Sequence, residues 1–268
     1  MPASEIIAIC STKGGVGKTT ICCGVASALE RMGRRVLVVD CDPNADTSTA
    51  LGLNPMADEV RPGTFELLLG RRPVPIVVER DSEGGRAPTG ICLIPGDERL
   101  VGNDVTSLFP ESLKFNLGAV VHPTSGLPFD VIVLDLPTAP RQLIHLGLRA
   151  ATAAVHVLDA HLFAVRKTQA LLSDCASWAD RGIDIVRRHC VVANRLNLSR
   201  RRDKDLLTLL PEIMNGFPQF LVKQDEGLAR ATSDGVPVHD RVNGSDAALA
   251  LTSIAEWATN SGLKKDDA

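Results

Sequence analysis

Short runs of apolar and β-branched residues recur along the chain and alternate with longer stretches of mixed polarity. Several of the short runs are continuously apolar, which is typical of strands that are covered on both faces of a sheet. They predict strands at Ile6–Cys10, Val36–Asp40, Ile91–Ile94, Val131–Leu134, Ala154–Leu158, Cys190–Ala193 and Phe220–Val222.

The longer stretches between these runs predict helices, because their apolar residues recur at helical spacing. The predicted helices are Lys18–Met32, Glu111–Val121, Gln142–Ala150, Arg166–Asp180, Lys204–Leu210 and Asp246–Asn260. Strand and helix alternate over the whole length, so we expect an α/β fold with a mostly parallel twisted sheet and helices on both faces.

We see no linker that separates two cores, and we expect one domain over residues 1–262 and a short charged tail at 263–268. The segment Arg80–Gly90 is polar and rich in glycine, and it is interpreted as an exposed loop.

Composition narrows the class of protein. Of 268 residues, 44% are hydrophobic and 23% are charged, which is ordinary for a globular chain. No apolar run is long enough for a membrane-spanning helix, and the first ten residues do not resemble a secretory signal, so we expect a cytoplasmic protein. Aromatic residues are only 3%, which disfavours base stacking on single strands, and the net charge of −3 requires that any contact with nucleic acid use a local patch.

Cysteine and histidine suggest no metal site of their own. The seven cysteines include no CxxC pair and the six histidines no HExxH motif.

Residues 11–20 carry the strongest chemical signal, because they read STKGGVGKTT between the first predicted strand and the first predicted helix. The general phosphate-loop pattern GxxxxGK[ST] fails, since Thr12 stands where its first glycine is required, but the variant KGGxGKT[ST] fits. Glycines let backbone N–H groups face a phosphate, and the helix N-terminus adds positive charge. We therefore expect a nucleotide phosphate site formed by Lys13, Gly14, Gly15, Val16, Gly17, Lys18, Thr19 and Thr20.

Within this loop, Lys18 is expected to contact the outer phosphates and the Thr19 hydroxyl to bind Mg²⁺. A dinucleotide fingerprint is the alternative, but GxGxxG fails at Thr20.

Acidic residues end two of the apolar runs. Asp135 follows Val131–Leu134 and would hold the Mg²⁺ beside Thr19, unless it only caps a turn. Asp40 and Asp42 share one face at the end of their strand, because alternate residues of a strand point the same way. For Asp42, capping of a turn before Pro43 is the alternative.

The chain resembles the ParA/MinD family of deviant Walker A ATPases. Lys13 is the signature lysine of that family, and four later segments match its motifs in order. These are VLVVDCDPN (36–44), ICLIPGDERL (91–100), FDVIVLDLPTAP (129–140) and HLFAVRKTQALL (161–172). Asn44, Thr138 and Arg166-Lys167 depart from the usual residues and leave the subfamily open.

The resemblance implies roles for particular residues and two cofactors, ATP and Mg²⁺. Asp42 would orient the attacking water, and Asp40 would join Thr19 and Asp135 in the magnesium shell. Lys13 has no evident task in its own subunit, and the resemblance implies that it contacts the nucleotide of a partner across a homodimer. Asn194 would read adenine, although a strand-end turn residue is the alternative.

A basic cluster is the candidate contact for DNA. Arg195 matches an arginine that contacts DNA in the family, and the run 200–202 is the densest group of cations. Such a patch binds phosphates without reading bases, although a solvated helix start is the alternative. The expected DNA-binding residues are Arg195, Arg200, Arg201 and Arg202, with Arg187 and Arg188 as a weaker extension.

The resemblance favours the short or chromosomal, Soj-like ParA branch. The chain's end, TNSGLKKDDA, lacks the membrane-binding amphipathic helix of the MinD branch, and we expect no helix-turn-helix extension. We therefore expect a nucleoid-associated ATPase that dimerises on ATP and binds double-stranded DNA non-specifically. A ParB-like partner would stimulate hydrolysis and link the dimer to a plasmid or chromosome. The alternatives are a protein cargo, such as carboxysomes or chemoreceptor clusters, and a metabolic ATP-dependent enzyme.

Overall fold

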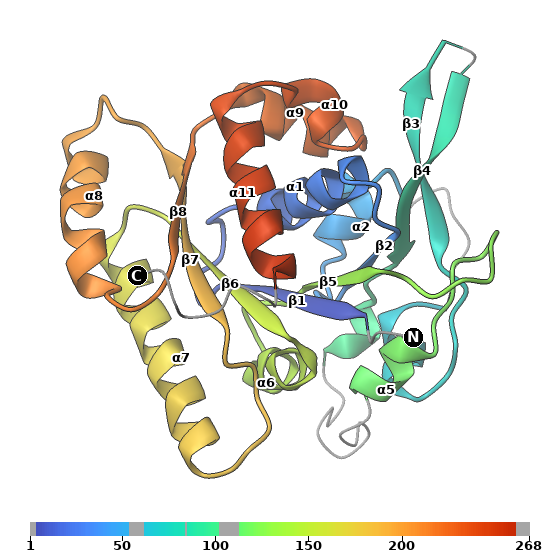
Figure 1. Ribbon diagram of the computed structural model, residues 1–268, viewed down its shortest axis with the longest axis horizontal. Coiled ribbons are helices and arrows are strands. Elements are labelled where there is room, and N and C mark those ends of the chain that lie inside the picture. The colour runs from blue at the N-terminus through green and yellow to red at the C-terminus, as the bar shows by residue number, and fades with distance from the viewer. Residues whose placement is uncertain (1–3, 54–61, 84, 102–112, 261–268) are drawn as a thin grey trace.

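The computed structural model describes residues 4–53, 62–83, 85–101 and 113–260, and Figure 1 shows how their helices flank one central sheet. The strands, in chain order, are β1 (Glu5–Cys10), β2 (Val36–Asp40), β3 (Ile76–Ser82), β4 (Gly85–Ile94), β5 (Val131–Asp135), β6 (Ala153–Leu158), β7 (His189–Leu196) and β8 (Gln219–Lys223). Their order in the sheet is β3-β4-β2-β5-β1-β6-β7-β8.

All neighbouring strands run parallel except β3 and β4, which form an antiparallel hairpin at one edge. Parallel strands present their carboxyl ends at the same edge of a sheet. At the centre of the sheet, Asp135 of β5 lies beside Ile9 of β1 on one side and beside Asp40 of β2 on the other. The segment that follows β1 is therefore placed next to both acids.

Helices cover both faces of the sheet (Figure 1). Their bounds are α1 (Lys18–Arg31), α2 (Asp46–Ala50), α3 (Thr64–Leu68), α5 (Leu113–Gly118), α6 (Arg141–Ala150), α7 (Leu162–Asp180), α8 (Arg201–Ile213), α9 (Glu226–Asp234), α10 (His239–Val242) and α11 (Asp246–Thr259), with a 3₁₀ turn at Glu98–Leu100.

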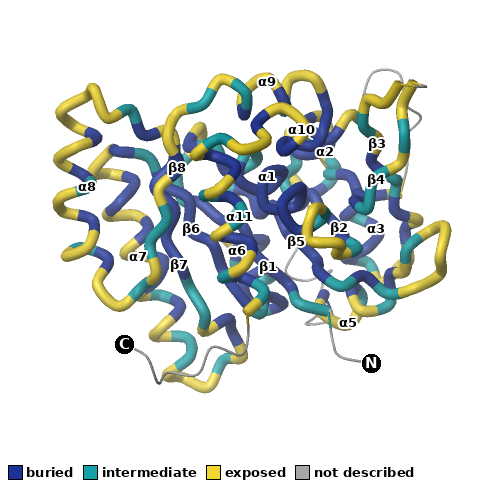
Figure 2. Tube along the Cα trace, turned by 45° about the horizontal axis from the view of Figure 1, so that its top comes forward, coloured by how far each residue is buried: buried dark blue, intermediate teal, exposed yellow. Residues whose placement is uncertain are grey.

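The central strands divide their side chains between two cores. On β1, Ile7 and Ile9 pack with α1 and α11, whereas Ile6 and Ala8 pack on the opposite side with α6. Residues of β2, β4 and β5 alternate in the same way, and Figure 2 shows these strands as the buried centre of the molecule. This two-sided burial explains why the strands are continuously apolar in sequence.

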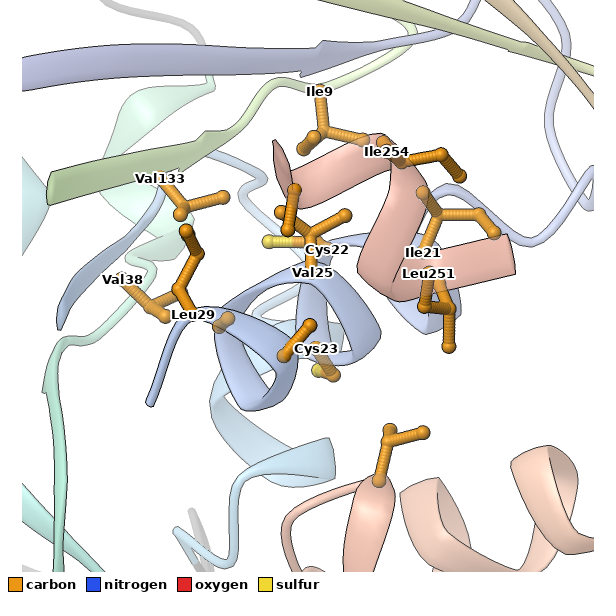
Figure 3. Packing of buried hydrophobic residues seen from close by; sticks show 14 of the residues in the cluster. Ile9, Ile21, Cys22, Cys23, Val25, Leu29, Val38, Val133, Leu251 and Ile254 are labelled. Atoms are coloured by element: carbon orange, nitrogen blue, oxygen red, sulfur yellow. The ribbon is translucent and has the colours of Figure 1, made fainter. Parts of the chain in front are cut away.

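Helix α1 is buried between the sheet and α11, as the packing of Ile21, Val25 and Leu29 in Figure 3 shows. A Cβ on Gly24 would lie 2.6 Å from the Cδ1 of Leu251, so this glycine permits the close approach of α11. Helix α1, which follows the phosphate loop, is thus held between the sheet and α11.

The predicted mostly parallel sheet with helices on both faces is confirmed, and each predicted strand is present. The interpretation of Arg80–Gly90 as a loop is wrong, because most of it forms the arms of the β3–β4 hairpin. Its polar residues are compatible with a strand because this hairpin is exposed at the sheet edge. Of the helix predicted at 111–121, residues 113–118 are helical, while residues 111–112 and the tail at 263–268 lie outside the described residues.

Among the described residues, no helix is both long and apolar enough to cross a membrane.

Candidate functional site

The loop from Ser11 to Gly17 joins β1 to α1 at the carboxyl edge of the sheet. Gly15 and Gly17 have φ values of 76° and 88°, a left-handed conformation that other residues adopt only with strain. A Cβ on Gly17 would also lie 2.3 Å from the Nδ2 atom of Asn194, so the position requires glycine for two separate reasons.

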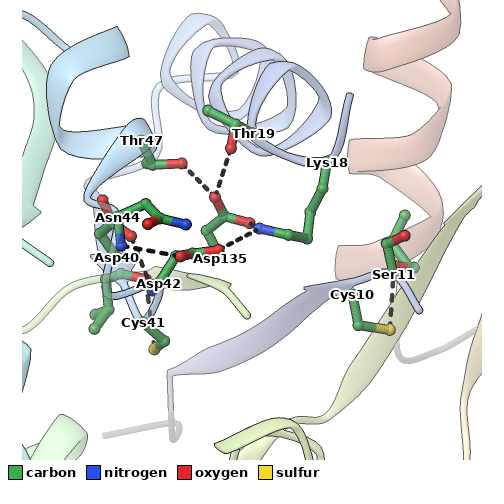
Figure 4. A network of polar contacts seen from close by, with 12 residues as sticks. Cys10, Ser11, Lys18, Thr19, Asp40, Cys41, Asp42, Asn44, Thr47 and Asp135 are labelled. Carbon is green, nitrogen blue, oxygen red and sulfur yellow. Dashed lines mark hydrogen bonds and ion pairs between the residues drawn. The ribbon is translucent and has the colours of Figure 1, made fainter. Parts of the chain in front are cut away.

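Lys18 is the first residue of α1, and its ammonium lies in a buried polar network (Figure 4). Its Nζ atom is 2.6 Å from Oδ1 of Asp135 and 3.7 Å from Oδ2 of Asp42. Burial alone would lower the pKa of Lys18, but the carboxylate of Asp135 outweighs it and raises that pKa above the usual range. Lys18 is therefore a fixed positive charge.

The other carboxylate oxygen of Asp135 accepts hydrogen bonds from two hydroxyl groups. Thr19 donates from 3.0 Å, and Thr47 of α2 donates through a short contact. Asp135 itself is completely buried. The predicted proximity of Thr19 and Asp135 is thus present in the structure.

Asp40 is also completely buried, and its two oxygens are already engaged in hydrogen bonds. The backbone N–H groups of Asp42 and Ser48 donate to them, as does the Ser48 hydroxyl from 2.7 Å. Burial, and then the nearby charge of Asp135, raise the pKa of Asp40 to about 7. The structure therefore gives Asp40 a part in shaping the Asp42 turn, and its predicted place in a magnesium shell stays a prediction.

Asp42 is mostly buried, and its Oδ1 atom accepts a local hydrogen bond from the backbone N–H of Asn44. Its Oδ2 atom faces Lys18. The geometry leaves one oxygen of Asp42 able to contact a ligand at the lysine.

Oxygen donors and surplus negative charge make this place suitable for Mg²⁺. Asp42 and Asp135 share one ammonium group, Asp40 lies beside Asp135 in the sheet, and the Thr19 hydroxyl donates to Asp135. In the described part of the chain, no three His, Cys, Asp or Glu side chains form a complete metal cage. Magnesium needs none in such sites, because one or two carboxylates and the phosphates of a substrate complete its shell. The residues present thus fit a magnesium–nucleotide complex.

The end of β7 contacts the loop from the other side. Asn194 donates from Nδ2 to the carbonyl of Val16 at 2.9 Å, and Arg195 donates from Nη1 to the carbonyl of Gly15 at 2.6 Å. Arg195 has a φ of 57°, an uncommon value for a residue with a side chain. Both residues therefore brace the loop, and the sequence pattern alone predicts neither contact.

Beside the loop lies an open pocket of about 640 Å³. It includes Asn194 and three of the four arginines expected to bind DNA, namely Arg195, Arg200 and Arg202. Arg201, in contrast, has a side chain that is 96% exposed. All four arginines are exposed, and they differ in that Arg201 does not line this pocket while the other three do.

Two further expectations change with the structure. Arg188 donates to three carbonyls at the end of α11, including Trp257 at 2.6 Å, so it is poorly placed to extend a DNA patch. The sequence indicates no task for Lys13 in its own subunit, yet its Nζ lies 2.5 Å from Oδ2 of Asp159.

Asp159, Thr47 and Ser48 are site residues that the sequence analysis missed. Asp159 directly follows β6, so it carries the same strand-end signal as Asp135 and could have been found by it. Thr47 and Ser48 lie on the short helix α2, which was not predicted.

Sequence comparison places the chain among known proteins. A family model described as an AAA domain matches residues 4–182. The chromosome partitioning protein ParA of Caulobacter vibrioides is 30% identical over 165 residues, which is 60% of this chain and 58% of that protein. The match thus spans less than two thirds of that relative's length.

Solved structures extend the likeness of the fold. Apo McdA from Cyanothece superposes with a TM-score of 0.74 at 20% identity, covering 95% of this chain and 99% of that one. MinD from Pyrococcus horikoshii, solved with Mg-ADP, superposes with a TM-score of 0.68 at 22% identity, covering 94% and 95%. The predicted P-loop NTPase fold is therefore confirmed.

Proposed function

This chain belongs to the ParA/MinD family of ATPases, and from that premise we propose that it is a ParA-type positioning ATPase. In this proposal ATP drives formation of a homodimer, the dimer binds nucleoid DNA non-specifically, and a ParB-like partner stimulates hydrolysis and release. The observation that carries the proposal is one loop with two lysines that have different partners. Lys18 pairs with Asp42 and Asp135, whereas Lys13 pairs with Asp159.

Lys18, the loop amides and Thr19 are proposed to bind the phosphates of ATP. Mg²⁺ would be held by Thr19 and Asp135 and would supply neutralisation of the phosphate charge. Because Lys18 occupies Asp135 in this structure, the ammonium must turn from the carboxylate toward the phosphates. The second ion-pair partner of the lysine, Asp42, would orient the attacking water.

The DNA contact is proposed to rest on the basic start of α8. The Arg201 side chain is 96% exposed, compared with 47% for Arg202, and a dimer would present two copies of it. Two linked contacts bind more tightly than one, since the second acts at a high effective concentration. This supports ATP-dependent binding to DNA phosphates without base recognition.

A plasmid or chromosome is the proposed cargo, because the ParA relative is a chromosome partitioning protein. The proposed place of action is the nucleoid in the cytoplasm.

The experiment measures oligomeric state and duplex binding together. Light scattering and fluorescence anisotropy with random duplex DNA are recorded with ATP, with ADP and without nucleotide, each with Mg²⁺. A dimer and salt-sensitive DNA binding only with ATP would support the proposal. Binding equally strong in every nucleotide state, or none in any, would contradict it.

A further inference from the structure

A second cavity, of about 580 Å³, is lined by residues of α6 and α7 and is separate from the pocket beside Asn194. These two helices pack on the same face of the sheet, where Ile144 and Leu171 belong to one core (Figure 1). We call this cavity the α6–α7 pocket. Small-molecule sites commonly have volumes of about 300–1,000 Å³ and combine apolar walls with a few polar groups. The size of the α6–α7 pocket thus fits a small ligand.

The charged side chains that line the α6–α7 pocket are both positive. They are Arg141 and Lys167, and no carboxylate is among the described residues of its wall. Arg141 pairs with Asp174 at 3.2 Å, but the arginine side chain is 80% exposed, so this ion pair is weak. Nζ of Lys167 lies 4.6 Å from the centre of the Phe163 ring. Both cations can therefore turn to an anionic group in the pocket.

The start of α6 adds to this positive character. Arg141 is the first residue of the helix, and no side chain caps the helix N-terminus. Its unpaired N–H groups and partial positive charge favour an anion at this end of the pocket.

An aromatic wall lies beside the cations. The rings of His145 and Trp178 meet at an angle of 62°, with their centres 4.5 Å apart. Ile144, Ala170 and Leu171 supply the aliphatic part of the wall. A flat ring can pack against this wall while an anionic group on the same molecule pairs with the cations.

Two polar atoms in the lining residues have no hydrogen-bond partner in the described part of the chain. They are Oγ1 of Thr12 and Nε2 of His145, and both are buried. Burial, and then the charge of Arg149, lower the pKa of His145, so its ring is uncharged at neutral pH. A hydroxyl and a neutral imidazole can each donate a hydrogen bond, and a buried donor without an acceptor costs free energy. A small side-chain rotation toward an occupant with oxygen acceptors would remove this cost.

We propose that the α6–α7 pocket binds a small aromatic acid, meaning a flat ring that carries one carboxylate, sulfonate or phosphate group. The pocket adjoins the nucleotide site, because Thr12 belongs to the phosphate loop and Thr138 follows Asp135 closely in the chain. An occupant that binds these segments as they stand should oppose the change in which Lys18 turns from Asp135 toward ATP. This coupling rests on the proposed function, whereas binding of the acid does not.

Anilinonaphthalene sulfonate is the probe, since it joins aromatic rings to one sulfonate and fluoresces when it leaves water. Titration of the nucleotide-free protein should show one saturable site. Ala170→Trp should weaken binding at least about tenfold, because an indole at this position fills the pocket. Ala176→Trp is the matched control, at an exposed position of α7 that does not line the pocket, and it should bind the dye as wild type does.

The need for an anionic group is tested with N-phenylnaphthylamine, which has the same rings without the sulfonate. Arg141→Gln combined with Lys167→Gln should weaken binding of the sulfonate several-fold and leave binding of the neutral amine unchanged. Arg166→Gln removes an exposed cation of α7 that does not line the pocket, and it should change neither.

Trp178 reports where the dye binds. The chain has two tryptophans, so Trp257→Phe leaves Trp178 as the only tryptophan that can transfer energy to the dye. Strong transfer is expected from a dye in the pocket. This measurement and the charge variant decide the test if Ala170→Trp does not fold.

Calorimetry with a slowly hydrolysed ATP analogue and Mg²⁺ measures the coupling. Saturating dye should weaken nucleotide binding a few-fold in wild type and not in Ala170→Trp. Nucleotide should weaken dye binding by the same factor, because coupling between two binding sites is reciprocal.

The outcomes separate the pocket, the ligand class and the coupling. Absence of saturable dye binding, binding that Ala170→Trp leaves unchanged, or binding without transfer from Trp178 would overturn the pocket. Sulfonate binding that survives loss of both cations would overturn the ligand class. Nucleotide binding that is indifferent to the dye would overturn the coupling. If wild type binds no nucleotide, the proposed function fails and the coupling fails with it, while blocked dye binding in Ala170→Trp still supports the pocket.

Discussion

The ammonium of Lys18 and the buried carboxylate of Asp135 form an ion pair, with Nζ 2.6 Å from Oδ1, at the place where the loop meets the end of β5. Both groups are expected to exchange partners when nucleotide binds, since Lys18 is assigned to phosphate and Asp135 to magnesium. The pair therefore keeps each charge compensated before the ligand arrives.

Lys18→Ala is expected to abolish ATP binding, because the outer phosphates lose the lysine at the start of α1. It also leaves Asp135 as an uncompensated buried charge, which costs about 3 kcal/mol of stability. Equilibrium binding of a fluorescent ATP analogue and urea denaturation measure the two effects. Unchanged nucleotide affinity in the folded variant would exclude the phosphate-loop assignment.

Asp42→Ala is expected to bind ATP and to hydrolyse it at least about tenfold more slowly than wild type, since the water is no longer oriented. The loop amides and Lys18 remain, so an ATP-bound dimer should accumulate. Phosphate release and light scattering in ATP and Mg²⁺ report both effects. A variant that is monomeric, or that turns over at the wild-type rate, would remove Asp42 from this role.

Asp40 predicts a pH dependence of stability in the nucleotide-free protein. Its folded pKa of about 7 lies above the unfolded value of about 3.9. Between these pH values the folded state therefore binds more protons than the unfolded state. The contribution of protonated Asp40 to the free energy of unfolding is full below about pH 4 and is lost as the pH rises through about 7. The slope is at most about 1.4 kcal/mol per pH unit for one group.

Urea denaturation at several pH values between roughly 5 and 8, the range in which Asp40 loses its proton, measures that slope. Asp40→Asn should flatten it, because the amide does not titrate. An equally steep slope in the variant would assign the effect to another group.

The arginines near α8 should separate by function. Arg201→Ala should weaken duplex binding in the ATP state, with ATP affinity unchanged. The slope of the logarithm of its DNA-binding constant against the logarithm of salt concentration should become less steep, by about one for each phosphate that the variant no longer neutralises. Arg195→Ala should instead weaken ATP binding by a few-fold, because the Gly15 carbonyl is no longer braced.

Anisotropy titrations with duplex at several salt concentrations, paired with nucleotide binding, make this comparison. If Arg195→Ala impairs only DNA binding, its hydrogen bond to the loop has no influence on ATP binding.

Much of the site was predictable because strand ends and a glycine-rich loop are local features. Asp135 and Asp40 were predicted because each ends an apolar run. The strands were predicted from those continuous apolar runs, which reflect burial on both faces of the sheet. The partner of Lys13 was not found, because Asp159 lies 146 positions away and only the sheet order brings β6 beside β1. Residues of the hairpin were missed because an exposed edge strand lacks the continuous apolar pattern of the central strands.

The edge strand β3 has a consequence for solubility at high local concentration. Its outer half carries Glu79, Arg80 and Asp81, and Arg80 is anchored to Glu30 of α1 at 2.6 Å. A free sheet edge can recruit the edge of another molecule, and inward or neighbouring charges are a common obstacle to such pairing. Copies of the protein crowded along DNA would thus meet one another at a charged hairpin on this edge. The charges discourage strand-to-strand aggregation. Reversible contacts are then left to the edge of the sheet that carries the phosphate loop.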